Sequence, residues 1–274
     1  MNNELHRSDM LETIRKYIIP AGLFAFVIFA LSHIPKIGID FEMLYSAGGA
    51  VWNLKNPYTI APGFYSAPWM LVILAPLSLF QLQTARWVWF ALGIICYVTA
   101  FKRMKISNIS IMVLMLNPFI YFDLMLGNYN WLILLGATLP AAVGSWFVIL
   151  KPQMSIVLFG LWIKQRRWLI FIPVTILAIL YALKLYVLPN TSGMYWSTSL
   201  WPYGIPIGLA LAWFGIKRDD LFLVLAAAPF LAPYVGVTTW LVVLLPFTRN
   251  KYLLTAGVLI SWVIGLWLVA LPNV

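Results

Sequence analysis

The sequence predicts an all-α polytopic membrane protein, and two observations carry this prediction. Of the 274 residues, 63% are hydrophobic and only 9% are charged. The mean hydropathy of +0.91 is well above that of soluble domains. Apolar runs recur along the whole chain, whereas a membrane barrel shows short alternating segments. We therefore expect a single membrane domain over residues 1–274, with roughly 9–11 transmembrane or re-entrant helices.

The basic residues gather in short turns between the apolar runs. A net charge of +10 is large enough to suggest a nucleic-acid partner, but this clustering argues against one. By the positive-inside rule such turns are cytoplasmic. We therefore expect a multi-pass protein of the plasma (cytoplasmic) membrane, with residues 1–16 as a cytoplasmic tail. The clusters lie at residues 15–16, 102–105, 164–167, 217–218 and 249–251.

This topology places each element of the first half. Residues 17–34 run outward as a signal anchor, and residues 35–85 form a first outer loop. In that loop the apolar positions of 41–54 have helical spacing, and 66–80 is an apolar run interrupted by Pro68 and Pro76. The prolines and the short length favour interfacial or half-inserted helices here. A helix over 86–101 then returns to the inside, and one over 107–122 runs outward.

The second half begins with an ambiguous segment, residues 131–150. If both of its ends face outward, each leg has about ten residues and reaches ~15 Å, half of the bilayer core. A re-entrant hairpin is the form we expect; one full crossing that places Lys151 inside is the alternative. The chain then reaches the basic turn at 164–167. The later helices are expected over 169–188, 205–216, 221–232, 238–248 and 253–271, with an external loop over 189–204.

Carboxylates are scarce, and few are placed to do chemistry. The chain has eight acidic residues; without those of the tail and of the 217–220 turn, Asp40, Glu42 and Asp123 remain. Asp40 starts the helical segment of the outer loop, so it is a candidate general base or hydroxyl ligand, or else the N-cap of that helix. Glu42 is a second acid or a solvated interfacial residue.

A series of short motifs follows the first apolar run in a fixed order. They are Asp40 and Tyr45, then N-P-Y at 56–58, an aromatic and proline at 65–68 before an apolar run ending in P-L, G-N-Y-N at 127–130, L-K-P-Q at 150–153 and A-P-Y-V-G-V-T-T-W at 232–240. In this order the motifs resemble glycosyltransferase family 87. The family resemblance covers residues 30–170 and, more faintly, the rest. The G-N-Y-N motif departs from the family's Gly-Gln-x-Asn because Asn128 replaces glutamine. No histidine lies in the second half of the chain.

The resemblance implies a GT-C fold and transfer of a sugar, typically mannose, from a polyprenyl-phosphate carrier to a glycolipid or glycan acceptor at the outer membrane face. Asp40 would be the base that deprotonates the acceptor hydroxyl, and Lys151 would contact the carrier phosphate. Other candidate substrate-binding residues are Glu42, Tyr45, Asn56, Tyr58, Tyr65, Arg86, Asp123, Asn128, Asn130, Gln153 and Lys184.

No group of His, Cys, Asp or Glu has metal-ligand spacing, so we expect neither metal nor cofactor. Two functions from other classes stay open. One is a transporter or flippase of a lipid-linked substrate, although the chain lacks the internal repeats common in transporters. The other is a scaffold subunit of an envelope complex.

Overall fold

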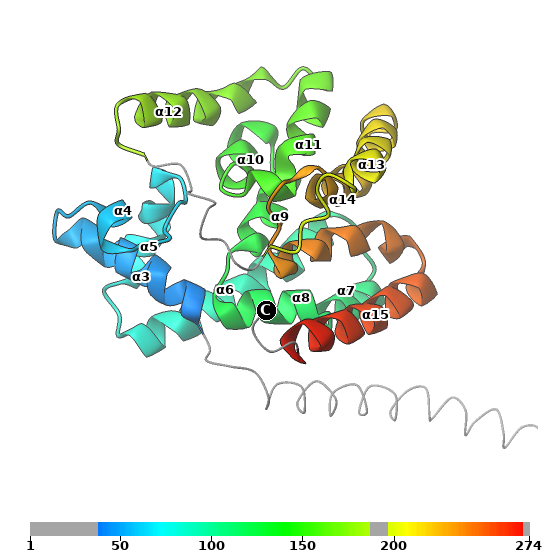
Figure 1. Ribbon diagram of the computed structural model, residues 1–274, viewed down its shortest axis with the longest axis horizontal. Coiled ribbons are helices and arrows are strands. Elements are labelled where there is room, and N and C mark those ends of the chain that lie inside the picture. Colours follow the sequence, from blue (N-terminus) through cyan, green and yellow to red (C-terminus); the bar gives the residue numbers. More distant parts are fainter. Residues whose placement is uncertain (1–37, 187–196, 271–274) are drawn as a thin grey trace, which may run out of the picture. The chain divides into compact units, whose positions relative to one another are not determined.

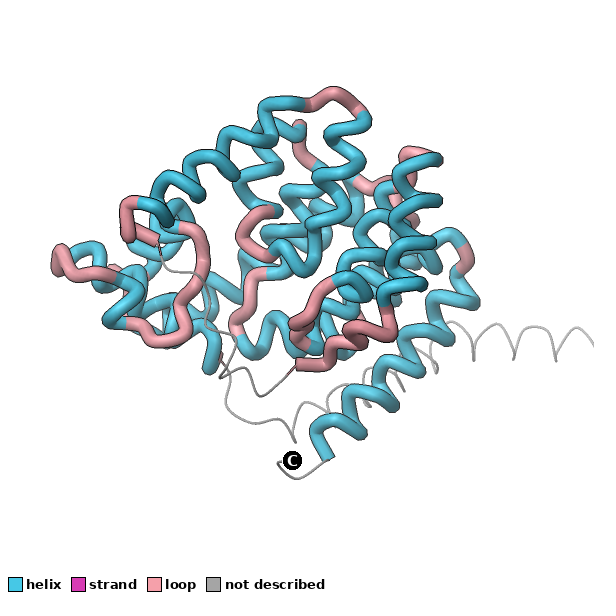
Figure 2. The backbone as a smooth tube through the Cα atoms, turned by 45° about the horizontal axis from the view of Figure 1, so that its top comes forward, coloured by secondary structure: helices cyan, strands magenta, loops and turns pink. Residues whose placement is uncertain are grey.

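The computed structural model of the chain describes residues 38–186 and 197–270, and every element in this part is a helix (Figures 1 and 2). The expected anchor over 17–34 and most of the external loop lie outside the described residues. The α-helices are α3 Ile39–Trp52, α4 Pro57–Ile60, α5 Leu71–Leu77, α6 Leu82–Arg103, α7 Asn108–Met115, α8 Pro118–Leu126, α9 Asn130–Thr138, α10 Ala141–Val148, α11 Pro152–Lys164, α12 Phe171–Ala182, α13 Ile205–Lys217, α14 Leu221–Leu231 and α15 Lys251–Ala270. The 3₁₀ helices are η2 Pro68–Met70, η3 Trp168–Ile170 and η5 Val237–Arg249.

The all-helical prediction is confirmed for the described residues, and the helices lie close to their expected positions. Their lengths say less about the membrane. In the described part, α6 is the helix long and apolar enough to cross a bilayer, and α7 with α8 would form a second span if the pair is counted as one. The number of crossings therefore stays a prediction.

The pair α7–α8 occupies the segment expected as one helix over 107–122. The two axes differ by 59° across the break. Pro118 has no N–H to continue the ladder of α7 and instead begins α8. The side chain of Asn117 caps the new helix by accepting a hydrogen bond of 2.7 Å from the N–H of Phe119.

Two predictions about broken segments agree with the structure. The apolar run after residue 66 forms a short helix over Pro68–Leu77, which is too short for a full crossing. Residues 131–150 form a two-legged hairpin of α9 and α10. Gly136 and Gly144 meet where its legs touch, and a Cβ on Gly144 would clash with the Gly136 carbonyl oxygen. Entry of either segment into a membrane stays a prediction.

The start of α3 is fixed against the end of α8, and this contact positions Asp40. The N–H of Gly38 donates a 2.6 Å hydrogen bond to the Met125 carbonyl. Gly127, with φ +78°, ends α8, and a Cβ there would clash with the Cβ of Phe41. The N-cap of α3 is Gly38, which makes no side-chain capping bond. Asp40 lies inside the first turn, so its possible role as the N-cap is wrong.

Gly127→Ala should strongly destabilise the protein. The substitution combines a left-handed backbone, which costs about 1–2 kcal/mol for a residue with a Cβ, with the clash against Phe41. We expect the thermal midpoint in detergent to fall by several degrees. Gly236→Ala is the matched control, because Gly236 has φ −72° and a Cβ added there would meet nothing within 4 Å. Equal losses in the two variants would contradict the close packing of α3 on α8.

Candidate functional site

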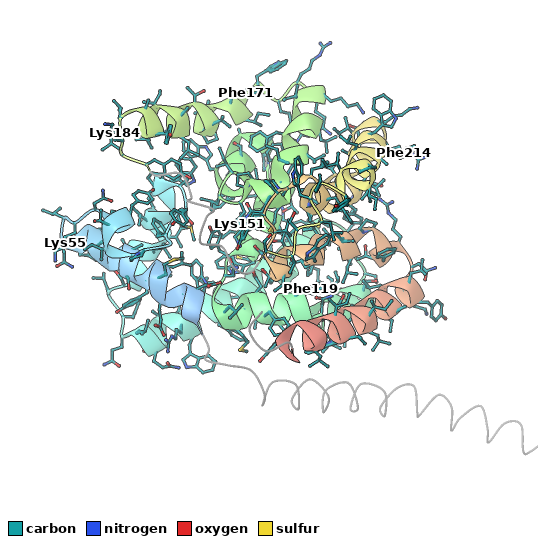
Figure 3. All side chains as sticks on the ribbon, in the orientation of Figure 1. Lys55, Phe119, Lys151, Phe171, Lys184 and Phe214 are labelled. Carbon is teal, nitrogen blue, oxygen red and sulfur yellow. The ribbon has the colours of Figure 1, made fainter. Side chains whose placement is uncertain are left out.

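Lys151 is the centre of the site. It lies just before α11 and occupies the middle of the molecule in Figure 3. Its Nζ donates hydrogen bonds of 2.5 Å to Oδ1 of Asn128 and 2.7 Å to Oδ1 of Asn130. The same ammonium lies 4.7 Å from the ring centroid of Tyr129. An ammonium has three N–H donors, so these two amide oxygens leave one donor for another ligand.

The loop that carries the two asparagines is held by tryptophans. The indole N–H of Trp89 donates to the Gly127 carbonyl at 2.9 Å, and that of Trp131 donates to the Asn128 carbonyl at 3.0 Å. The two indoles meet edge to face at 4.7 Å. Because both bonds go to the backbone, residues 127–128 are fixed before any substrate binds.

Two carboxylates lie within electrostatic reach of Lys151. Burial raises the pKa of Asp40 above its usual value of 3.8, and the Lys151 charge opposes that rise. Burial lowers the pKa of Lys151, whereas Asp123 and Asp40 both raise it. Neither acid forms an ion pair with Lys151 within the described part of the chain. The site therefore contains opposite charges that influence one another without direct contact.

Asp123 is fully buried, and a tyrosine of α6 holds its carboxylate. Its Oδ2 accepts a 2.6 Å hydrogen bond from the hydroxyl of Tyr97. Among the described residues, its Oδ1 has no partner at ordinary hydrogen-bond geometry. A buried carboxylate needs a nearby positive charge, and Lys151 supplies it. Asp123 thus contributes to the charge balance of the site, and its burial leaves it out of reach of a bulky substrate.

Asn130 connects Lys151 to η5. Its side-chain amide is fully buried; Oδ1 accepts from Lys151, and Nδ2 donates a 2.9 Å hydrogen bond to Oγ1 of Thr238. The ammonium can only donate, so it requires Oδ1 of the amide on its side, and the amide NH₂ then donates to the threonine hydroxyl. Thr238 was not among the predicted site residues, although it lies in the 232–240 motif.

Thr238→Val should weaken the site because it removes the acceptor for Asn130 while conserving shape. An unsatisfied buried donor costs about 1–3 kcal/mol, which predicts a lower thermal midpoint in detergent. Thr238→Ser keeps the hydroxyl and should stay close to the wild-type protein. If valine and serine lower the midpoint equally, the hydroxyl does not hold Asn130.

Several tyrosines form a second network beside Lys151. The Tyr129 hydroxyl lies 2.7 Å from Oγ of Ser66, and the Tyr58 hydroxyl donates to the Ser66 carbonyl at 3.0 Å. The Tyr186 hydroxyl donates to the carbonyl of Tyr65 at 3.1 Å. Tyr58 therefore acts by tying the outer-loop segment together, and Tyr65 takes part through its backbone.

Other predicted residues lie apart from Lys151 or have structural partners. Glu42 is exposed and forms an ion pair with Arg86, so these two candidates pair with each other. The Tyr45 hydroxyl donates to the Phe80 carbonyl at 2.8 Å, and Asn56 caps α4. Gln153 makes no side-chain hydrogen bond within the described residues. Lys184 is exposed and lies away from Lys151 (Figure 3).

The structure thus brings together Asp40, Asp123, Asn128, Asn130 and Lys151, drawn from three separate stretches of sequence. It adds Tyr97, Tyr129 and Thr238, none of which was predicted as a site residue. Tyr129 could have been found from its place between the two asparagines. Tyr97 lies in an apolar run without a recognisable motif.

The arrangement combines a carboxylate with a raised pKa, able to accept a proton, and an ammonium with a spare donor, able to bind an anion. Comparison of the chain with protein families, with curated proteins and with solved structures found no match.

Proposed function

We propose that the chain is a multi-pass membrane glycosyltransferase that moves a sugar, mannose in the first instance, from a polyprenyl-phosphate carrier to an acceptor hydroxyl at the outer membrane face. One observation carries the proposal. Asp40 and Lys151 are far apart in the sequence, yet in the fold each lies within reach of the other's charge. Burial raises the pKa of Asp40 and lowers that of Lys151, and the opposite charge of the other residue works against each shift. A base and an anion-binding cation are the two groups that such a displacement requires.

The reaction follows from these two groups. Asp40 takes the proton of the acceptor hydroxyl, and the hydroxyl oxygen forms a bond to the anomeric carbon of the sugar. The bond between that carbon and the phosphate oxygen breaks, and the electron pair leaves with the carrier phosphate. The remaining N–H of Lys151 would donate to the phosphate and stabilise its added charge. Asn128 and Asn130 hold the ammonium, so we assign them to positioning and not to sugar contact.

The deciding experiment is transfer by the purified protein. It is reconstituted in liposomes with polyprenyl-phosphate mannose and lipid acceptors, with and without a metal chelator, and the glycosylated product is measured. We expect product in both conditions. Movement of the lipid headgroup across the bilayer without any product would favour the transporter, and neither activity would favour a scaffold.

Transfer should also depend on pH in a defined direction. A general base works as the carboxylate, and burial raises the pKa of Asp40 above 3.8. Activity should therefore be full above the raised pKa and fall as the pH drops through it, at a higher pH than an exposed aspartate would give. The pH profile of kcat/KM measures this acidic limb. A rate that stays constant down to about pH 4, the usual range of an exposed aspartate, would contradict Asp40 as a base with a raised pKa.

A further inference from the structure

The basic turns of the chain are joined into one surface in the folded protein. We define the cationic surface as the turns at residues 102–105, 164–167, 217–220 and 249–251. Lys164 donates hydrogen bonds of 2.6 Å to the Ile216 carbonyl and 2.9 Å to Oδ2 of Asp219. Arg249 donates to Oδ2 of Asp220 at 2.6 Å. These bonds connect three turns from different helix pairs.

The remaining turn joins through its neighbouring helix. Lys102 donates to Oδ1 of Asn108 at 2.9 Å, and the hydroxyl of Ser110 on the same helix donates to the Thr248 carbonyl at 3.3 Å. The cationic surface is thus continuous from α6 through α7 to the start of α15. Asp219 and Asp220 are its acidic residues, and its Lys and Arg residues are all exposed.

Four of these cations make no polar contact with the described part of the chain. Within the described residues, the side chains of Lys105, Arg166, Arg167 and Lys217 make no hydrogen bond or ion pair. Exposed aromatic residues lie beside them: Trp168 is 59% exposed and Trp213 67%. Free cations flanked by exposed indoles match the boundary of a bilayer, where headgroup phosphates meet the first methylenes.

We propose that the cationic surface binds anionic phospholipid headgroups, such as phosphatidylglycerol, and that this contact stabilises the fold. Anionic lipid supplies both the negative charge for the free cations and an apolar boundary for the indoles. An acidic soluble protein would match only the charge. The inference rests on the chain being a membrane protein and not on its being a glycosyltransferase, so failure of the transfer assay leaves it standing.

The test is a thermal melt of the full chain in neutral detergent with added phosphatidylglycerol or phosphatidylcholine. We expect phosphatidylglycerol to raise the midpoint, phosphatidylcholine to have little effect, and salt to weaken the difference. The double variant Arg167→Gln/Lys217→Gln should need roughly thirty-fold more phosphatidylglycerol to reach half of the rise in midpoint. This factor corresponds to the binding free energy that two basic residues typically contribute near an anionic surface.

Lys55→Gln/Lys184→Gln is the matched control, because it removes the same charge from two exposed lysines. Phe214 neighbours the cationic surface, and both lysines lie on the opposite side of the view from it in Figure 3. It should leave the lipid response unchanged. An equal weakening in both double variants would overturn the assignment to this surface. An equal stabilisation by glycerol phosphate would show an effect of free phosphate and would overturn lipid binding.

Discussion

Replacing Asp40 by asparagine should remove sugar transfer while leaving the protein folded. Asparagine has the shape of aspartate but cannot accept the acceptor proton. Loss of a general base lowers rates by about 10²–10⁴, so kcat in the reconstituted assay should fall by that range. Binding of the donor should change little, because the carrier phosphate is assigned to Lys151.

The stability of Asp40→Asn separates catalysis from structure. The carboxylate is half-buried and makes no hydrogen bond to the described part of the chain, and its raised pKa means that its surroundings disfavour the charged form. At neutral pH the neutral asparagine should therefore give a thermal midpoint equal to or above that of the wild-type protein. If Asp40 served only to stabilise the fold, Asp40→Asn would lower the thermal midpoint.

Asp219→Asn is the control for the loss of one acid. Asp219 lies in the turn at 217–220 and contacts Lys164 and Gln165, away from Lys151. Its replacement should leave kcat unchanged. Transfer that survives in Asp40→Asn at the wild-type rate would remove Asp40 as the base.

The positions of the helices could be predicted because apolar runs, prolines and basic turns are local signals. Pro68 and Pro76 correctly indicated that residues 66–80 form only a short helix. The sharp bend at Pro118 was missed because the run over 107–122 is apolar almost throughout. Its causes are Pro118, which has no N–H to continue α7, and the side chain of Asn117, which caps the start of α8.

The site residues were predictable from two signals: charged side chains beside apolar runs, and the G-N-Y-N motif that carries Asn128 and Asn130. Lys151 and Asp40 were found because an ionisable residue beside apolar runs needs a partner. Partners such as Thr238 and Tyr97 are ordinary residues of apolar helices, and their roles follow from tertiary contact alone. For the same reason Arg86 was expected near substrate, whereas the structure pairs it with Glu42.

Replacing Lys151 by methionine should abolish sugar transfer and lower the thermal midpoint. The change leaves Oδ1 of Asn128 and of Asn130 without the ammonium, and it leaves the buried Asp123 without a positive charge nearby. A buried acceptor left without its donor costs about 1–3 kcal/mol, and Asp123 loses the opposing charge of Lys151 as well. We expect a drop of several degrees in the thermal midpoint and no measurable transfer.

A second substitution distinguishes the electrostatic cause from lost packing. In Lys151→Met/Asp123→Asn both charges are gone, and the Tyr97 hydroxyl can still donate to the asparagine oxygen. The midpoint should recover part of the loss, because no uncompensated buried carboxylate remains at Asp123. Transfer should stay absent, since the group assigned to the phosphate is still missing.

Lys55→Met is the matched control, because Lys55 is exposed and lies away from Lys151 (Figure 3). It should change neither the midpoint nor transfer. If Asp123→Asn fails to restore any stability to Lys151→Met, the ammonium acts through its asparagine contacts and not through the buried acid. If Lys151→Met retains transfer at the wild-type rate, another group must bind the departing phosphate.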